Sequence, residues 1–77
     1  QVKIQFDLTE SSHILVSVYD INGRWAQTIT NEFLSKGIHS FHWDGKSSIG
    51  RTLSAGKYFI HFQTQNGHQL KLITFLK

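Results

Sequence analysis

Apolar and polar residues alternate along most of the chain, which is the pattern expected of β-strands with one buried face. In the first stretch, for example, single polar residues separate Val2, Ile4 and Phe6. The alternation predicts six strands, at residues 2–8, 13–20, 24–30, 38–44, 57–65 and 68–77. Turn-forming residues separate them at intervals of roughly 8–12 residues, which is typical of an antiparallel sandwich or barrel. Residues 32–34 are helix-compatible, but the stretch is too short to predict a helix.

Two Asn-Gly pairs, Asn22-Gly23 and Asn66-Gly67, fall between predicted strands. This dipeptide favours a type I′ hairpin turn, in which both central residues have positive φ. We therefore expect a tight hairpin at each pair.

Two aspartates, Asp20 and Asp44, stand just before turns, and Gly45 completes the second turn. Aspartate side chains in such positions accept hydrogen bonds from nearby backbone amides. Arg24 lies close enough in sequence to pair with Asp20 or to stack on an aromatic ring. We interpret both carboxylates as structural rather than as a catalytic pair.

The last predicted strand is apolar on both faces, with Leu70 and Leu72 on one face and Ile73 and Phe75 on the other. Such a strand is either central in its sheet or presents one face to something else. In both cases we expect Leu70 and Leu72 to belong to the core. We also expect most of the burial to come from Trp25, Trp43 and the six phenylalanines.

The composition indicates one ordered domain covering residues 1–77. The chain is 39% hydrophobic and 13% aromatic, which is too rich in apolar residues for a disordered segment. The absence of cysteine excludes disulfides and thiolate chemistry. No apolar run approaches the length of roughly 18 residues that a membrane span requires, so we expect no direct membrane insertion.

Charge is distributed unevenly along the chain. The net charge is +3, and all acidic residues lie in the first 44 positions. Five basic residues and no acidic one follow: Lys46, Arg51, Lys57, Lys71 and Lys77. A basic second half fits an acidic partner, or it serves solubility alone.

Signatures of chemistry are weak. His39 and His42 are expected on opposite faces of one strand, whereas His61 and His68 could approach each other across a hairpin. Two imidazoles without a nearby carboxylate make a poor metal site, so we expect no metal and no cofactor. The basic residues are scattered and the aromatic residues alternate as core positions do, which argues against nucleic-acid binding. Sugar binding by Trp25 or Trp43 remains an alternative.

Six short motifs occur in order along the chain: Val16-Ser17-Val18-Tyr19-Asp20, Asn22-Gly23-Arg24, Gly37-Ile38-His39, Trp43-Asp44-Gly45, Gly50-Arg51 and Ser54-Ala55-Gly56-Lys57-Tyr58-Phe59. Together they resemble the C-terminal sorting domain of type IX secretion substrates in Bacteroidetes. The related immunoglobulin-like domain of flagellar hook-capping proteins shares much of this pattern. The resemblance extends over nearly the whole chain.

The sorting-domain resemblance implies an all-β, antiparallel immunoglobulin-like sandwich of about seven strands. The additional strand is expected near residues 51–53. It also implies a secretion signal, excised here from a larger exported protein, and not an enzyme. The expected partners are the type IX translocon or shuttle of the outer membrane and a sortase-like protease. The signal would then be cleaved or exchanged for an anchor, and the protein would pass through the periplasm to the cell surface or medium.

Two groups of residues carry this interpretation. Recognition is expected on the last two strands, at Gly56, Tyr58, Lys71, Ile73, Phe75 and Lys77. The signature of the fold is expected in the turns, at Asp20, Asn22, Gly23, Arg24, Trp43, Asp44 and Gly45. The alternative is a structural immunoglobulin-like module of the hook-cap type, or a spacer or carbohydrate-binding accessory domain of an extracellular enzyme. An open sheet edge would also allow a homodimer by strand pairing.

Overall fold

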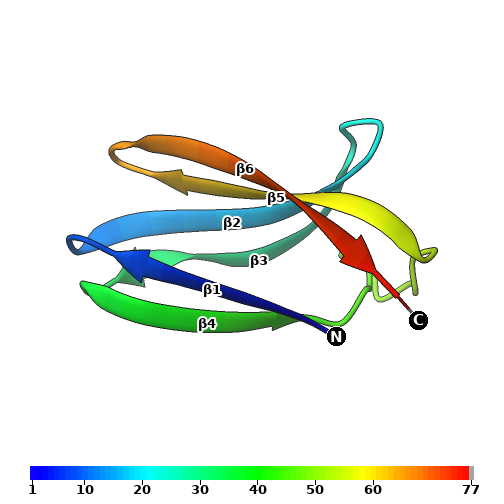
Figure 1. Ribbon diagram of the computed structural model, residues 1–77, viewed down its shortest axis with the longest axis horizontal. Coiled ribbons are helices and arrows are strands. Elements are labelled where there is room, and N and C mark those ends of the chain that lie inside the picture. The colour runs from blue at the N-terminus through cyan, green and yellow to red at the C-terminus, as the bar shows by residue number, and fades with distance from the viewer. Residues whose placement is uncertain (77) are drawn as a thin grey trace.

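The computed structural model describes residues 1–76, which form an all-β sandwich (Figure 1). The six strands are β1 (Val2–Leu8), β2 (Ser12–Asp20), β3 (Trp25–Leu34), β4 (Gly37–Trp43), β5 (Gly56–Thr64) and β6 (Gly67–Phe75). They pair antiparallel into a two-stranded sheet, β1-β4, and a four-stranded sheet, β3-β2-β5-β6. The predicted fold class is confirmed. No helix in this part of the chain is long and apolar enough to cross a membrane.

Two details of the strand prediction were wrong. The helix-compatible residues 32–34 belong to β3, because they continue its ladder with β2 as far as the Ser12–Leu34 pair. The additional strand expected near residues 51–53 does not form, and Thr52 makes a single isolated bridge with Lys46. A tight turn precludes a longer ladder there, since the Gly50 amide donates to the Ser47 carbonyl oxygen at 2.9 Å. The described chain therefore has six strands rather than seven.

The core lies between the two sheets and consists of alternate residues of each strand. β2 and β5 contribute the side chains at the centre of the core. These side chains are fully buried, with Val16 and Val18 0% exposed and Ile60 1% exposed. The full set of buried apolar residues is Ile4, Leu8, Ile14, Val16, Val18, Ala26, Trp43, Tyr58, Ile60 and Phe75. The buried residues of β1, β2 and β5 thus follow the period-2 alternation from which these strands were predicted.

Three aromatic rings connect the sheets. Trp43 pairs with Val2 at the start of β1, and Phe75 ends β6, so the rings lie at the end of the sandwich where β1 begins and β6 ends, whose strand ends Figure 1 shows. Trp43 of β4 lies with its ring centroid 5.0 Å from that of Tyr58 and 5.2 Å from that of Phe75. The indole N–H of Trp43 donates to the Lys46 carbonyl oxygen at 3.0 Å, and the Tyr58 hydroxyl donates to the Ser54 carbonyl oxygen at 2.6 Å. Both polar atoms of this aromatic cluster are therefore satisfied although the rings are buried.

Several large apolar residues expected in the core are exposed. Trp25 is 52% exposed, and its indole N–H donates to the Thr28 hydroxyl at 3.1 Å on the sheet surface. Leu70 and Leu72 are 59% and 49% exposed. The reason is topological: β6 is an edge strand paired with β5 alone, and its even-numbered residues face away from the other sheet. Of the two alternatives for the last strand, the structure excludes a central position, and one apolar face of β6 is exposed.

Gly45 is required by the aromatic cluster as well as by its turn. Its φ is +79°, and a methyl group placed there would lie 2.0 Å from Cζ of the Phe75 ring. Gly50 provides a matched control, because its φ is +82° and no heavy atom lies within 4 Å of such a methyl group.

We predict that Gly45→Ala lowers the free energy of unfolding by about 3 kcal/mol, the sum of a left-handed backbone cost and an overpacking cost. Gly50→Ala should show only the backbone cost, about 1–2 kcal/mol. Urea unfolding of both variants measures the difference. Equal losses would mean that Phe75 does not restrict the position.

Candidate interaction surface

The turn between β2 and β3 is organised by one carboxylate. Asp20 Oδ1 accepts hydrogen bonds from the backbone amides of Asn22 and Arg24, each at 2.9 Å. The Arg24 side chain adds an ion pair, with its Nε 3.2 Å from Asp20 Oδ2. Gly23 has a φ of +84°, whereas Asn22 does not have a positive φ, so the expected type I′ turn was wrong. Asp20 stabilises a longer turn instead.

These contacts also affect the titration of Asp20. The hydrogen bond from the Arg24 backbone amide is the main cause that lowers the pKa of the Asp20 carboxyl below its ordinary value. The Asn22 amide and the Arg24 guanidinium lower this pKa further, against an opposing effect of desolvation. The carboxylate is held as a structural group, as the sequence predicted.

The other signature residues are likewise structural. Asp44 Oδ1 accepts a hydrogen bond from the Lys46 amide at 3.1 Å, as expected for an aspartate before a turn. Trp43 is 1% exposed and belongs to the aromatic cluster. The second Asn-Gly pair, Asn66-Gly67, lies at the β5–β6 hairpin. The ladder between these two strands ends at the Thr64–Gly67 pair. The two-residue loop is therefore residues 65–66, with Gly67 as the first residue of β6.

The residues expected to form a recognition surface do not lie together on one. Tyr58 and Phe75 are core residues, 7% and 4% exposed, and Ile73 is half-buried. Gly56 begins β5 and pairs with Phe75. Lys71 is exposed, and Lys77 lies outside the described residues. Within the described part of this set, Lys71 alone is exposed.

A different surface, which the sequence interpretation missed, crosses the outer face of the four-stranded sheet. Cross-strand pairs connect Trp25 to Tyr19, Tyr19 to Phe59, and Phe59 to Leu72. These four residues, the outer row, place a continuous apolar line over β3, β2, β5 and β6. Exposed apolar surface of this kind marks sites of contact with other molecules. The signal in the sequence was the second apolar face of β6, together with Tyr19 and Phe59 at outward positions.

A shallow cavity of about 500 Å³ adjoins the outer row and includes the histidine pair. The rings of His61 and His68 approach to 5.3 Å across the hairpin, as expected, and Tyr19 lies 6.1 Å from His61. His39 faces inward against Phe6, with ring centroids 5.8 Å apart. Among residues 1–76, no three metal-ligating side chains converge. The histidine pair therefore extends the aromatic surface.

The fold defines the class of protein. It is an antiparallel sandwich of the immunoglobulin type, with two sheets and with turns that aspartate side chains stabilise. A family model described as the FlgD Ig-like domain matches residues 1–68. The chain belongs to this FlgD Ig-like domain family. Of the two related families that the sequence resembles, the finding supports the flagellar one, and the type IX assignment stays a prediction.

Similar proteins include the basal-body rod modification protein FlgD of Salmonella typhimurium strain LT2 and that of Escherichia coli strain K12. Each is 35% identical over 54 residues, covering 70% of this chain and 23% of the relative. A solved structure of FlgD from P. aeruginosa is 34% identical with a TM-score of 0.75, and the match covers 96% of this chain and 58% of that one. The homology to FlgD supports the prediction that the domain is not an enzyme. The chain spans about a quarter of the length of the curated relatives that it matches.

The lowered pKa of Asp20 predicts a specific pH dependence. A carboxyl whose folded pKa is depressed stabilises the fold above its unfolded pKa, and this contribution is lost as the pH falls through the folded pKa. We predict that Asp20→Asn lowers the melting temperature at pH 7 and that the difference from wild type shrinks below about pH 4. Thermal melts across this range measure it, with Asp7→Asn on β1 as the charge-matched control. Parallel curves for wild type and Asp20→Asn would contradict the assignment.

Proposed function

We propose that the domain is a structural interaction module of a hook-cap type protein in an extracytoplasmic flagellar assembly. The observation that carries this proposal is the family membership over residues 1–68, together with the structural match over 96% of the chain. The domain would act by contact, because the motif residues of this chain are turn-forming and core side chains rather than reacting groups.

The outer row supplies the surface through which such a module would act. Trp25 and Leu72 are about half exposed, and the half-buried Tyr19 and Phe59 lie between them. The inward residues of the sheet beneath are among the most deeply buried of the domain. An exposed apolar strip on the face of a sheet fits a protein partner better than a small molecule, which binds in concave pockets.

The secretion-signal interpretation remains the alternative, with the type IX translocon and a sortase-like protease as its partners. It would require that machinery to recognise the last strand as the secretion signal. Phe75 lies in the aromatic cluster, so removing the end of the chain would disturb the whole fold. A test must therefore remove the entire domain or change exposed residues only.

We predict that in-frame removal of the domain from the protein that carries it prevents hook assembly, whereas the shortened protein is still exported. Electron microscopy of the cells and immunoblots of the cell fractions measure the two outcomes separately. Retention of the shortened protein inside the cell, with hooks unaffected, would contradict the proposal and favour the secretion signal.

A matched pair of substitutions addresses the outer row itself. Leu72→Glu places a charge in the row, and Thr74→Glu places the same charge on the same exposed face of β6 beside it. Under the proposal, only Leu72→Glu impairs assembly.

A further inference from the structure

One side of the sandwich is open. The edge strands there are β1, which pairs only with β4, and β6, which pairs only with β5. Figure 1 shows the two strands running in opposite directions on either side of this opening. Each presents a row of backbone N–H and C=O groups that no strand within residues 1–76 pairs. Unpaired strand edges of this kind are templates for an additional strand.

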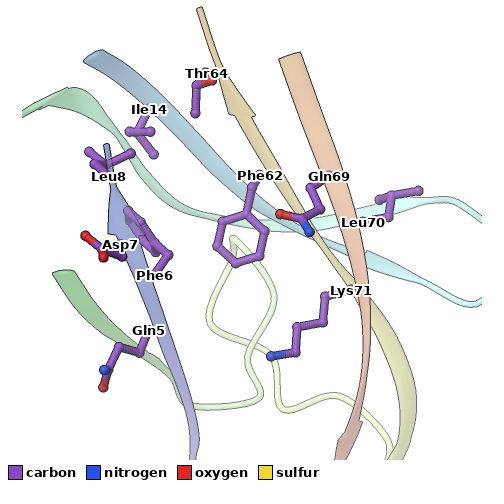
Figure 2. Close-up of a pocket in the computed structure, with 10 residues that line it drawn as sticks. All are labelled: Gln5, Phe6, Asp7, Leu8, Ile14, Phe62, Thr64, Gln69, Leu70 and Lys71. Atoms are coloured by element: carbon purple, nitrogen blue, oxygen red, sulfur yellow. The ribbon is translucent and has the colours of Figure 1, made fainter. Parts of the chain in front are cut away.

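A groove of about 480 Å³ lies between β1 and β6. Figure 2 shows Phe6 and Phe62 pointing toward each other across it, and their rings meet edge to face with centroids 5.5 Å apart. Both rings are only half-buried although they belong to inward faces, and so are Val2 and Ile73 on the same side. The apolar interior is therefore incompletely covered along this side.

The smaller sheet is also short by one strand. Sandwiches of the immunoglobulin type have about seven strands, divided four and three. Here the sheets have four and two, and residues 51–53 do not supply the missing strand. We propose that the free edge of β1 is an acceptor site for an extended strand from another polypeptide segment, which completes the smaller sheet. This inference does not depend on the flagellar role.

The two open edges are not equivalent. On β6, Gln69 and Lys71 point into the groove, whereas Leu70 points away (Figure 2). Inward polar and charged side chains are a common protection of an edge strand against pairing. On β1 the inward side chains are Ile4, Phe6 and Leu8, all apolar. The edge of β1 is therefore the receptive one.

Lys71 specifies the chemistry of the occupant. Lys71 is exposed, and its side chain points from β6 into the groove (Figure 2). The occupant is thus an extended segment with apolar side chains toward Phe6 and Phe62 and one acidic side chain toward Lys71. A second copy that inserted its β6 would bring a second Lys71 into the groove, and like charges disfavour this.

The test uses the 77-residue domain, labelled for NMR, and two nine-residue peptides of alternating threonine and valine. One peptide carries a central glutamate in a valine position and the other a lysine. We expect the glutamate peptide to slow amide exchange at the free-edge amides of β1, and to bind roughly twofold to fivefold more tightly than the lysine peptide, as for an exposed ion pair. Replacing alternate threonines with proline should abolish binding, because proline cannot donate to a ladder.

Two variants of the exposed Lys71 test the charge. Lys71→Glu should reverse the preference between the peptides, and Lys71→Gln should remove it. Protection at the β6 amides, or at the outer row, would overturn the proposal. So would concentration-dependent dimerisation of the free domain with protection of β6, since the occupant would then be a second copy.

Discussion

No backbone ladder joins the two sheets of residues 1–76, so beyond the connecting loops their packing depends on side chains. The aromatic cluster of Trp43, Tyr58 and Phe75 is the contact on which this connection depends at one end of the sandwich. Each ring comes from a different strand, and β4 belongs to the smaller sheet. Full burial of side chains of this size contributes about 1.5–3 kcal/mol each, which is large for a domain of this length.

Several residues in or next to the six sequence motifs stabilise this aromatic cluster. Gly45 leaves room for the Phe75 ring, and the carbonyl oxygens of Lys46 and Ser54 accept the two buried polar hydrogens. The motif therefore reports the fold, and related families with different roles can share it. Residues available to a partner, such as Trp25 and Leu72, lie on the outer face instead.

The sequence was sufficient for the existence of the six strands and for their inward faces, because period-2 alternation reflects burial directly. It was also sufficient for Asp20 and Asp44, whose hydrogen bonds are local. It was not sufficient for the end of β3 or for the seventh strand, which does not form. It could not reveal that β6 is an edge strand, since a strand apolar on both faces looks the same at a sheet centre and beside an open surface. Leu70 and Leu72 were misplaced for this reason. The outer row and the groove depend on strand order, which is a long-range property.

A double-mutant cycle between Trp43 and Phe75 tests the central claim most directly. Urea unfolding would be measured for Trp43→Leu, Phe75→Leu and the double variant. If the two rings act together across the sheets, the combined loss differs from the sum of the single losses by about 0.5–1.5 kcal/mol. Losses that add to within about 0.3 kcal/mol would show that the rings act independently, and the account of how the sheets are held together would be contradicted.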